Sequence, residues 1–104
     1  MKKTLKPENT ATTAVRLARK RVIFTAKARP GATVFLAGSF NDWNNSDKEM
    51  KDKQGDGLFT AICYLPAGTY EYKFFIDGVW CTDTTNPNVV STPLNTLNSI
   101  IEVK

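Results

Sequence analysis

The chain has 104 residues, of which 41% are hydrophobic and 11% aromatic, and this is enough for one folded domain with a modest core. It contains no His, which excludes Ser-His and Cys-His catalysis, and its two cysteines are too few for a four-ligand zinc site. The formal charge of +4 is uneven: residues 1–29 carry nine Lys or Arg against one acid (+8), and residues 30–104 carry five Lys against nine acids (−4).

The first 20 residues are basic and mostly polar, and we expect them to form an arm outside a folded module of residues 21–104. We expect residues 1–13 of the arm to be mobile, while residues 14–21, which reach the first residue of the module, are compatible with one or two helical turns. No apolar segment follows the basic start, so no secretory signal is predicted. No apolar run approaches the length of a membrane span, and we expect no membrane partner.

Apolar and polar residues alternate in several short segments, and a period of two is typical of half-buried β-strands. The strands expected on this basis are 22–28, 33–38, 58–65, 70–76 and 98–104, with a further short strand near 49–51. Residues 29–32 (Arg-Pro-Gly-Ala) predict a turn, and residues 39–57 and 81–97 are expected to be long connections. Several short strands without a convincing long helix predict an all-β sandwich.

The pair Asp77-Gly78 predicts a tight hairpin, because a type I′ turn needs positive φ at both central residues. The two-residue turn sets the register and places Phe75 opposite Trp80. The face expected to point to the core carries Tyr70, Tyr72, Phe74, Ile76, Val79 and Cys81. The face expected to meet solvent carries Glu71, Lys73, Phe75 and Trp80. A Trp beside a Lys on a solvent-facing sheet indicates a binding surface.

Both cysteines, Cys63 and Cys81, fall at core-facing strand positions. Burial as reduced, small hydrophobic residues is typical of proteins in a reducing compartment, and we expect this state and a cytoplasmic location. A disulfide between the two is the open alternative.

Catalysis through paired carboxylates has three candidates, Asp42, Asp77 and Asp83. Each lies in a predicted turn or loop, and that position explains the residue better. No glycine-rich phosphate-binding loop leads into a helix. We therefore expect neither an enzyme nor a bound cofactor.

Ligand binding is the better interpretation of the two tryptophans, Trp43 in the loop after the second strand and Trp80 on the hairpin. Each taken alone is more often a core residue, since Trp is highly buried on average. An exposed Trp beside amide and ammonium groups suits a sugar, because the indole covers the apolar face of a pyranose while Lys or Asn bonds its hydroxyls. Single-stranded nucleic acid also stacks on aromatic rings, but it prefers a basic groove, and residues 30–104 are acidic.

A resemblance to a known family rests on four motifs in order: Gly-Ser-Phe-Asn-Asp-Trp at 38–43, Leu-Pro-Ala-Gly at 65–68, Tyr-Lys-Phe-Phe-Ile-Asp-Gly-Val-Trp at 72–80, and Leu-Asn-Thr-Leu-Asn at 94–98. Over residues 22–104 the chain resembles carbohydrate-binding module family 48. That family includes the glycogen-binding domain of AMP-activated protein kinase beta subunits and the early-set domains of isoamylases. The resemblance implies an immunoglobulin-like, early-set antiparallel β-sandwich that binds α-1,4-glucans without hydrolysing them.

The resemblance also implies a set of carbohydrate-binding residues, namely Trp43, Lys73, Trp80, Leu94, Thr96 and Asn98. In the family the two tryptophans stack on glucose rings, and the lysine and the asparagine bond sugar hydroxyls. The leucine reaches into the curve of the glucan, with the threonine nearby. The chain departs from the kinase-type pattern at Ser99, where that pattern usually has a second Asn.

The leading hypothesis is a non-catalytic module that binds glycogen, starch or maltooligosaccharides, with a glucan-metabolising enzyme as a candidate protein partner. The alternative is an early-set protein-interaction or regulatory module that does not itself bind sugar. The full set of stacking and hydrogen-bonding residues favours sugar binding, since a docking sandwich does not need it. A nucleic-acid binder that uses the basic arm is the third and least favoured interpretation.

Overall fold

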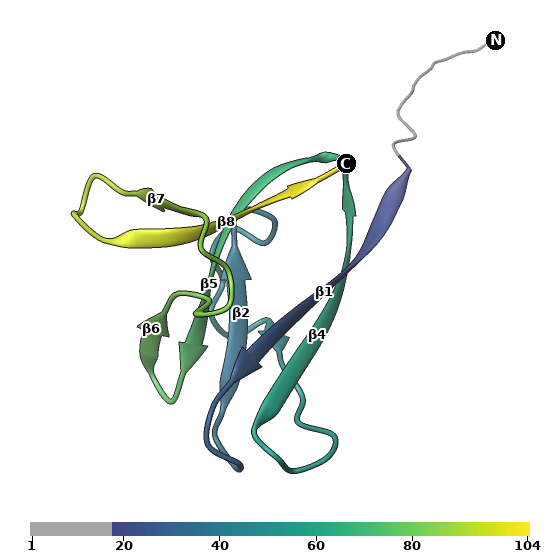
Figure 1. Ribbon diagram of the computed structural model, residues 1–104, viewed down its shortest axis with the longest axis vertical. Helices are drawn as coiled ribbons and strands as arrows, with labels where there is room; N and C mark the ends of the chain where they lie inside the picture. Colours follow the sequence, from purple (N-terminus) through teal and green to yellow (C-terminus); the bar gives the residue numbers. More distant parts are fainter. Residues whose placement is uncertain (1–17) are drawn as a thin grey trace, which may run out of the picture.

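The computed structural model describes residues 18–104, and these residues form eight β-strands and no helix (Figure 1). The strands are β1 (Arg19–Lys27), β2 (Val34–Gly38), β3 (Lys48–Glu49), β4 (Leu58–Pro66), β5 (Gly68–Ile76), β6 (Val79–Cys81), β7 (Val89–Ser91) and β8 (Leu97–Val103). All pairings are antiparallel, in a two-stranded sheet β1-β4 and a six-stranded sheet of order β3-β2-β5-β8-β7, in which β6 also pairs with β5. The predicted all-β antiparallel sandwich is confirmed.

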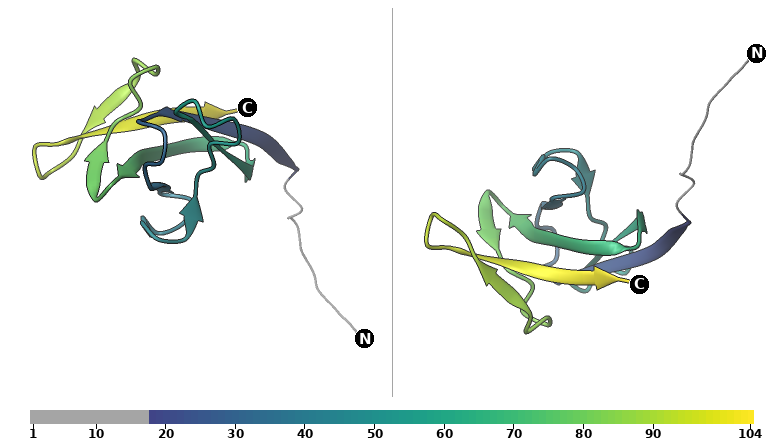
Figure 2. Two further views of the ribbon diagram at one scale, coloured as in Figure 1. Left: turned by 90° about the horizontal axis from the view of Figure 1, so that it is seen from below. Right: turned by 90° about the horizontal axis from the view of Figure 1, so that it is seen from above.

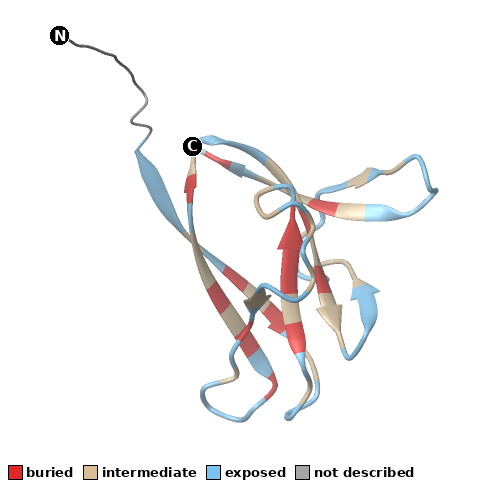
Figure 3. Ribbon diagram, turned by 180° about the vertical axis from the view of Figure 1, so that it is seen from behind, coloured by how far each residue is buried: buried red, intermediate tan, exposed pale blue. Residues whose placement is uncertain are grey.

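The core lies between the two sheets, and buried residues alternate along the strands with residues that face outward (Figure 3). Along β1, for example, Phe24 and Ala26 are buried, while Ile23 is exposed. The buried cluster comprises Phe24, Ala26, Val34, Leu36, Met50, Phe59, Ala61, Leu65, Tyr72, Phe74 and Val103. The alternation read from the sequence therefore identifies the inner faces of β1, β4 and β5. Of residues 18–104, no helical segment is long and apolar enough to cross a membrane.

The central strand of the larger sheet is β5, and its two edges have different neighbours. One edge pairs with β2, from Val34 opposite Ile76 to Gly38 opposite Tyr72. The other edge pairs with β6 beside residues 74–76 and with β8 beside residues 68–72, so Lys73 lies at the junction between them. In both views of Figure 2, β6 and the loop that joins β7 to β8 lie away from β1 and β4.

The β5–β6 hairpin has the predicted turn and register. Asp77 and Gly78 have φ of 48° and 82°, and Phe75 lies opposite Trp80. The expectation that Val79 faces the core is wrong, because its exposed fraction is 60%. Val79 lies in the predicted register opposite Ile76, but the turn extends beyond the edge of the core, so no opposing sheet covers its side chain.

Two further expectations are corrected by the structure. The helical turns expected up to Arg21 are wrong for residues 19–21, because β1 pairs with β4 from Arg19 opposite Pro66 onward. Residues 1–17, which include most of the predicted arm, lie outside the described residues. The connection expected at 81–97 contains β7, whose Val90 pairs with Asn98 of β8.

Both cysteines are free thiols and are half-buried. Cys63 packs against the core cluster, as predicted from its strand position. Burial raises the pKa of the Cys63 thiol, although the positive charge of Lys48 opposes this effect.

Candidate functional site

A shallow depression of about 350 Å³ lies between the β5–β6 hairpin, the loop after β2 and the turn between β7 and β8. Its lining residues are Trp43, Lys73, Trp80, Thr92, Leu94, Thr96 and Asn98, and we call this surface the tryptophan depression. The structure thus brings together all six residues expected to bind carbohydrate. It adds Thr92, which the sequence reasoning missed.

Trp43 is positioned by a tight loop that follows β2. The side chain of Asn41 accepts a hydrogen bond from the Gly38 N–H at 3.0 Å and donates one to the Leu36 carbonyl at 3.3 Å. The Trp43 N–H donates to the Gly38 carbonyl at 3.0 Å. Asp42 and Trp43 both have positive φ (56° and 58°), which costs about 1–2 kcal/mol for a residue with a side chain. The hydrogen bonds of the loop therefore keep Trp43 in a backbone conformation that is itself unfavourable.

Gly38 is required at the start of this loop because the backbone is crowded there. A Cβ at position 38 would lie 2.5 Å from the Glu71 carbonyl oxygen and 2.6 Å from the Phe40 ring. Any larger residue would displace the loop that carries Trp43. The motif Gly-Ser-Phe-Asn-Asp-Trp therefore has a physical basis in loop geometry.

The two tryptophans form an apolar corner of the depression. Their ring centroids are 6.5 Å apart and their planes are inclined at 70°. Trp80 also packs against Phe75, with centroids 4.8 Å apart, and it keeps 42% of its surface exposed. Trp80 therefore lies outside the core and presents an aromatic surface to solvent.

The polar floor of the depression comes from β5 and β8. Lys73 lies on β5 between the ends of β6 and β8, and its ammonium group can only donate hydrogen bonds. Asn98 lies on β8, and its Nδ2 donates to Glu71 Oε1 at 3.0 Å. The floor therefore offers one cationic group and one side-chain amide beside the aromatic corner.

The turn between β7 and β8 is braced by the hydroxyl of Thr92. This oxygen accepts hydrogen bonds from the N–H groups of Leu94 and Thr96 at 3.2 and 3.3 Å. The Thr92 and Thr96 hydroxyl oxygens also share a hydrogen bond at 2.7 Å, in which either hydroxyl can be the donor. These three contacts tie both hydroxyl groups to one turn.

The same turn holds Leu94 out of the protein surface, with 84% of it exposed. The Asn95 N–H donates to the Thr92 carbonyl at 3.0 Å and closes a four-residue turn in which Pro93 is the second residue. Asn95 has φ of 64°, the left-handed conformation that Asn tolerates well. The Pro-Leu-Asn sequence at 93–95 is typical of a three-residue hairpin loop. Recognising that loop would have placed Thr92 at its start and identified it as a residue of the site.

The carboxylates considered as catalytic candidates serve backbone turns. Asp77 accepts a hydrogen bond from the Thr33 N–H at 3.0 Å, and Asp83 accepts one from the Thr85 N–H at 3.0 Å. Asp42 lies in the left-handed turn before Trp43. Within residues 18–104, no group of three or more His, Cys, Asp or Glu side chains is placed to hold a metal ion. The groups in the depression are suited to binding through stacking and hydrogen bonds.

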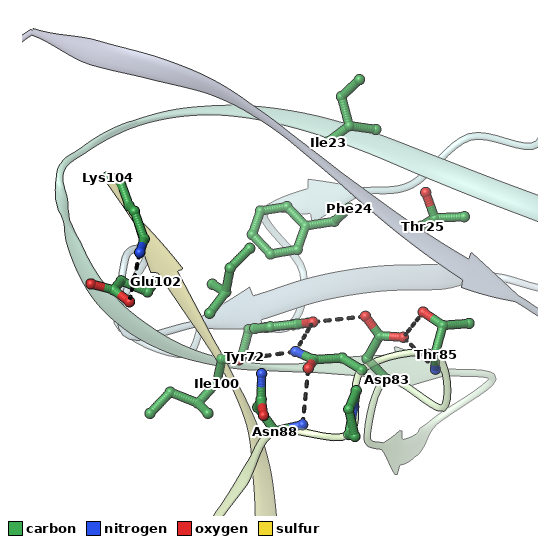
Figure 4. A pocket seen from close by; sticks show the side chains of 13 residues that line it. Ile23, Phe24, Thr25, Tyr72, Asp83, Thr85, Asn88, Ile100, Glu102 and Lys104 are labelled. Atoms are coloured by element: carbon green, nitrogen blue, oxygen red, sulfur yellow. Dashed lines mark hydrogen bonds and ion pairs between the residues drawn. The ribbon is translucent and has the colours of Figure 1, made fainter.

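A second and larger hollow, about 500 Å³, lies between β1, β8 and the loop after β6 (Figure 4). We call it the tyrosine cavity, because the Tyr72 O–H at its floor donates to Asp83 Oδ2 at 2.7 Å. Asn86 Nδ2 donates to the Tyr72 oxygen at 3.0 Å and to the Ile100 carbonyl at 2.9 Å. The Asp83 N–H donates to the buried hydroxyl of Ser99 at 2.8 Å. These groups bond one another and fix the loop to the sheet.

Burial raises the pKa of the Tyr72 hydroxyl well above its ordinary value. The hydrogen bond to Asp83 and the negative charge of that residue add to this rise, while the bond from Asn86 opposes it. Tyr72 is therefore a neutral structural donor over the physiological range of pH.

An antiparallel sandwich with an open aromatic depression and a polar floor has the architecture of a surface-binding module. The chain belongs to the family described as "Glycogen recognition site of AMP-activated protein kinase", which matches residues 21–104. It is 41% identical over 88 residues to 5'-AMP-activated protein kinase subunit beta-2 of Rattus norvegicus and of Homo sapiens. It is 40% identical over 87 residues to the beta-1 subunit of Rattus norvegicus.

Each alignment covers most of this chain but less than a third of the relative. They include 77% of this chain but 31% of each beta-2 subunit, and 76% of this chain but 30% of the beta-1 subunit. The chain therefore spans less than a third of the length of these relatives. The match extends to the part of the chain that carries the tryptophan depression.

Proposed function

We propose that this chain binds α-1,4-glucans, such as glycogen, starch or maltooligosaccharides, on the tryptophan depression. The observation that carries the proposal is the convergence of Trp43, Lys73, Trp80, Leu94, Thr96 and Asn98 on one surface from five separate elements. Membership of a family described by glycogen recognition supports the same ligand class.

The chemistry of the surface matches a glucan. Trp43 and Trp80 stack on the apolar faces of glucose rings, and Leu94 projects into the curve of the chain. Lys73, Thr96 and Asn98 bond hydroxyl groups around the rings. The surface is open to water, so each polar contact replaces a water contact and adds little net free energy. We expect a dissociation constant on the order of micromolar to millimolar, or about −4 to −8 kcal/mol.

We propose that the module is regulatory and does not catalyse a reaction on the glucan. The relatives are named as subunits of a protein kinase, and this supports a second role in bringing a partner enzyme to a glucan. We also propose a cytoplasmic location, which is supported by the two unbridged cysteines. An early-set docking module that does not bind sugar is the competing function.

The test is retention of the purified chain on insoluble starch and on glycogen coupled to a resin, with cellulose as the control. We expect retention on both α-glucans, release by a soluble maltooligosaccharide, and passage through cellulose. Equal retention on cellulose and starch, or no retention on either α-glucan at millimolar glucose-unit concentrations, would contradict glucan binding. The docking function would then take its place.

A further inference from the structure

Glu71 lies beside the tryptophan depression but is not one of its lining residues. We propose that Glu71 is a positioning residue that fixes the side-chain amide of Asn98 and thereby sets the hydrogen-bonding pattern offered to the glucan. This inference rests on the proposed glucan-binding function. It assigns a role to a residue that the sequence reasoning placed only on the outer face of the hairpin.

The sheet register brings these two side chains to the same face. Tyr72 pairs with Ser99, and both are buried, so their neighbours Glu71 and Asn98 point to the outer face. The two lie on adjacent strands in a diagonal relation, a spacing of about 7–8 Å that long side chains can bridge. The contact is made by Asn98 Nδ2 and Glu71 Oε1 at 3.0 Å.

The chemistry of a carboxylate determines which way the amide turns. An ionised Glu can only accept hydrogen bonds, so the NH₂ group of Asn98 faces Glu71 and its carbonyl oxygen faces away. Without Glu71, the two orientations of an amide have similar shape, and hydrogen bonding alone chooses between them. Glu71 therefore removes that ambiguity before a ligand arrives.

The fixed orientation complements Lys73. Lys73 supplies only donors, whereas the held amide keeps Oδ1 as an acceptor and one N–H as a further donor. A sugar hydroxyl both donates and accepts, so a donor and an acceptor at fixed places select neighbouring hydroxyls with a matching arrangement. An amide free to rotate would have to be ordered on binding, at a cost in affinity.

The experiment is calorimetric titration of the full chain with a linear maltooligosaccharide. Glu71→Ala should lower the association constant by about twofold to tenfold, the range expected for one hydrogen bond. Glu71→Gln should also lower it, by less, because a Gln amide donates as well as accepts and therefore leaves both orientations of the Asn98 amide open. Glu102→Ala is the matched control, since the Glu102 carboxylate pairs with Lys104 at 3.8 Å outside the depression, and it should bind like the parent.

A double-mutant cycle separates positioning from charge. The loss caused by Glu71→Ala should disappear when Asn98 is already Ala, because the two residues then have no interaction left to lose. The side-chain amide signals of Asn98 in a ¹⁵N–¹H spectrum of the sugar-free protein should move in Glu71→Ala and in Glu71→Gln, and stay in place in Glu102→Ala. This second readout does not depend on sugar binding.

Three outcomes would overturn the proposal. A parent chain that binds glucan together with an unaffected Glu71→Ala variant would remove the role of Glu71 and leave the proposed function standing. A loss that persists in the Asn98→Ala background would show that Glu71 acts through its charge instead. A folded parent chain that does not bind glucan would end both the proposed function and this inference.

Discussion

The tryptophan depression and the tyrosine cavity differ mainly in what their polar atoms are bonded to. The cavity is the larger, at about 500 Å³ against about 350 Å³. Its Tyr72, Asp83 and Asn86 side chains are bonded to one another and to the backbone. In the depression, the ammonium group of Lys73 has no ion pair within residues 18–104.

The larger volume therefore does not by itself make the tyrosine cavity the better candidate for a binding site. A ligand gains from polar atoms that have no protein partner and from aromatic surface that water already reaches. Trp80 is 42% exposed, whereas Tyr72 is 2% exposed, so the first is available to a ligand and the second supports the core. Variants in the two hollows should therefore affect different measurements.

The largest expected effect is the loss of glucan binding when both tryptophans are removed. Trp80→Ala should lower the association constant about tenfold or more, equivalent to about 1.4 kcal/mol, and Lys73→Ala should lower it less. The pair Trp43→Ala with Trp80→Ala should abolish binding, because stacking supplies most of the affinity in an open, wet site. Calorimetric titration with a maltooligosaccharide measures each step.

The control for this experiment is Tyr64→Ala, which removes an exposed aromatic residue from β4 outside the depression. It should bind like the parent, and all of these variants should keep a melting midpoint close to that of the parent. If both single tryptophan variants bind as well as the parent, the depression is not the binding surface. A collapsed melt for Trp80→Ala would place that residue in the core.

The next largest effect is expected in stability, from the tyrosine cavity. Tyr72→Phe removes the hydroxyl that bonds Asp83 and Asn86, and we expect a loss of about 1–3 kcal/mol in the free energy of unfolding. Glucan affinity of the folded variant should stay unchanged. Urea unfolding gives the stability, and Tyr64→Phe, which alters an exposed hydroxyl, should unfold like the parent. A variant as stable as the parent would contradict the structural role of the network.

The raised pKa of Tyr72 predicts a related loss at alkaline pH. The hydroxyl stays neutral in the folded state at a pH where an unfolded Tyr, with a pKa of about 10, would ionise. Its stabilisation is therefore complete below about pH 10 and falls as the pH rises toward the folded pKa. Unfolding free energies from about pH 8 to about pH 11 should fall more steeply for the parent than for Tyr72→Phe. Parallel curves of unfolding free energy against pH for the parent and Tyr72→Phe would contradict a raised pKa of Tyr72.

The smallest effect is expected at Thr92, which braces the β7–β8 turn without providing a stacking surface. Thr92→Val keeps the shape but removes the hydroxyl that bonds Leu94, Thr96 and the Thr96 side chain. We expect glucan affinity to fall by about twofold to tenfold, because the turn must then be ordered on binding. Thr92→Ser keeps the hydroxyl and should bind like the parent. Equal binding by the valine and serine variants would show that the brace is dispensable.

Much of the fold was predictable because its signals are local. The alternation in β1 and β4 and the Asp77-Gly78 turn depend on residues within a few positions of one another. β7 was missed because a three-residue strand carries little pattern of its own and forms through pairing with β8. The extension of β1 to Arg19 was missed for the same reason, since its partner Pro66 is distant in sequence.

The site shows the same division between local and distant signals. The resemblance named six lining residues, and the structure brings them together, while their roles in binding stay a prediction. Thr92 and Glu71 were not identified because each acts through a second residue. Thr92 acts on Thr96 within one turn, whereas Glu71 reaches Asn98 across 27 positions in sequence, and only a three-dimensional register joins them.

The placement of both tryptophans in one depression has an optical consequence. The sequence contains two Trp residues in all, so every indole of the protein lies on the same surface. Their centroids are 6.5 Å apart and their planes are inclined at 70°, close enough for their ultraviolet transitions to couple. The tryptophan fluorescence of the chain, excited where Tyr and Phe do not absorb, therefore reports on this surface without background from the core. A ligand that stacks on either ring would change the emission of the whole molecule, and no label would be needed to see it.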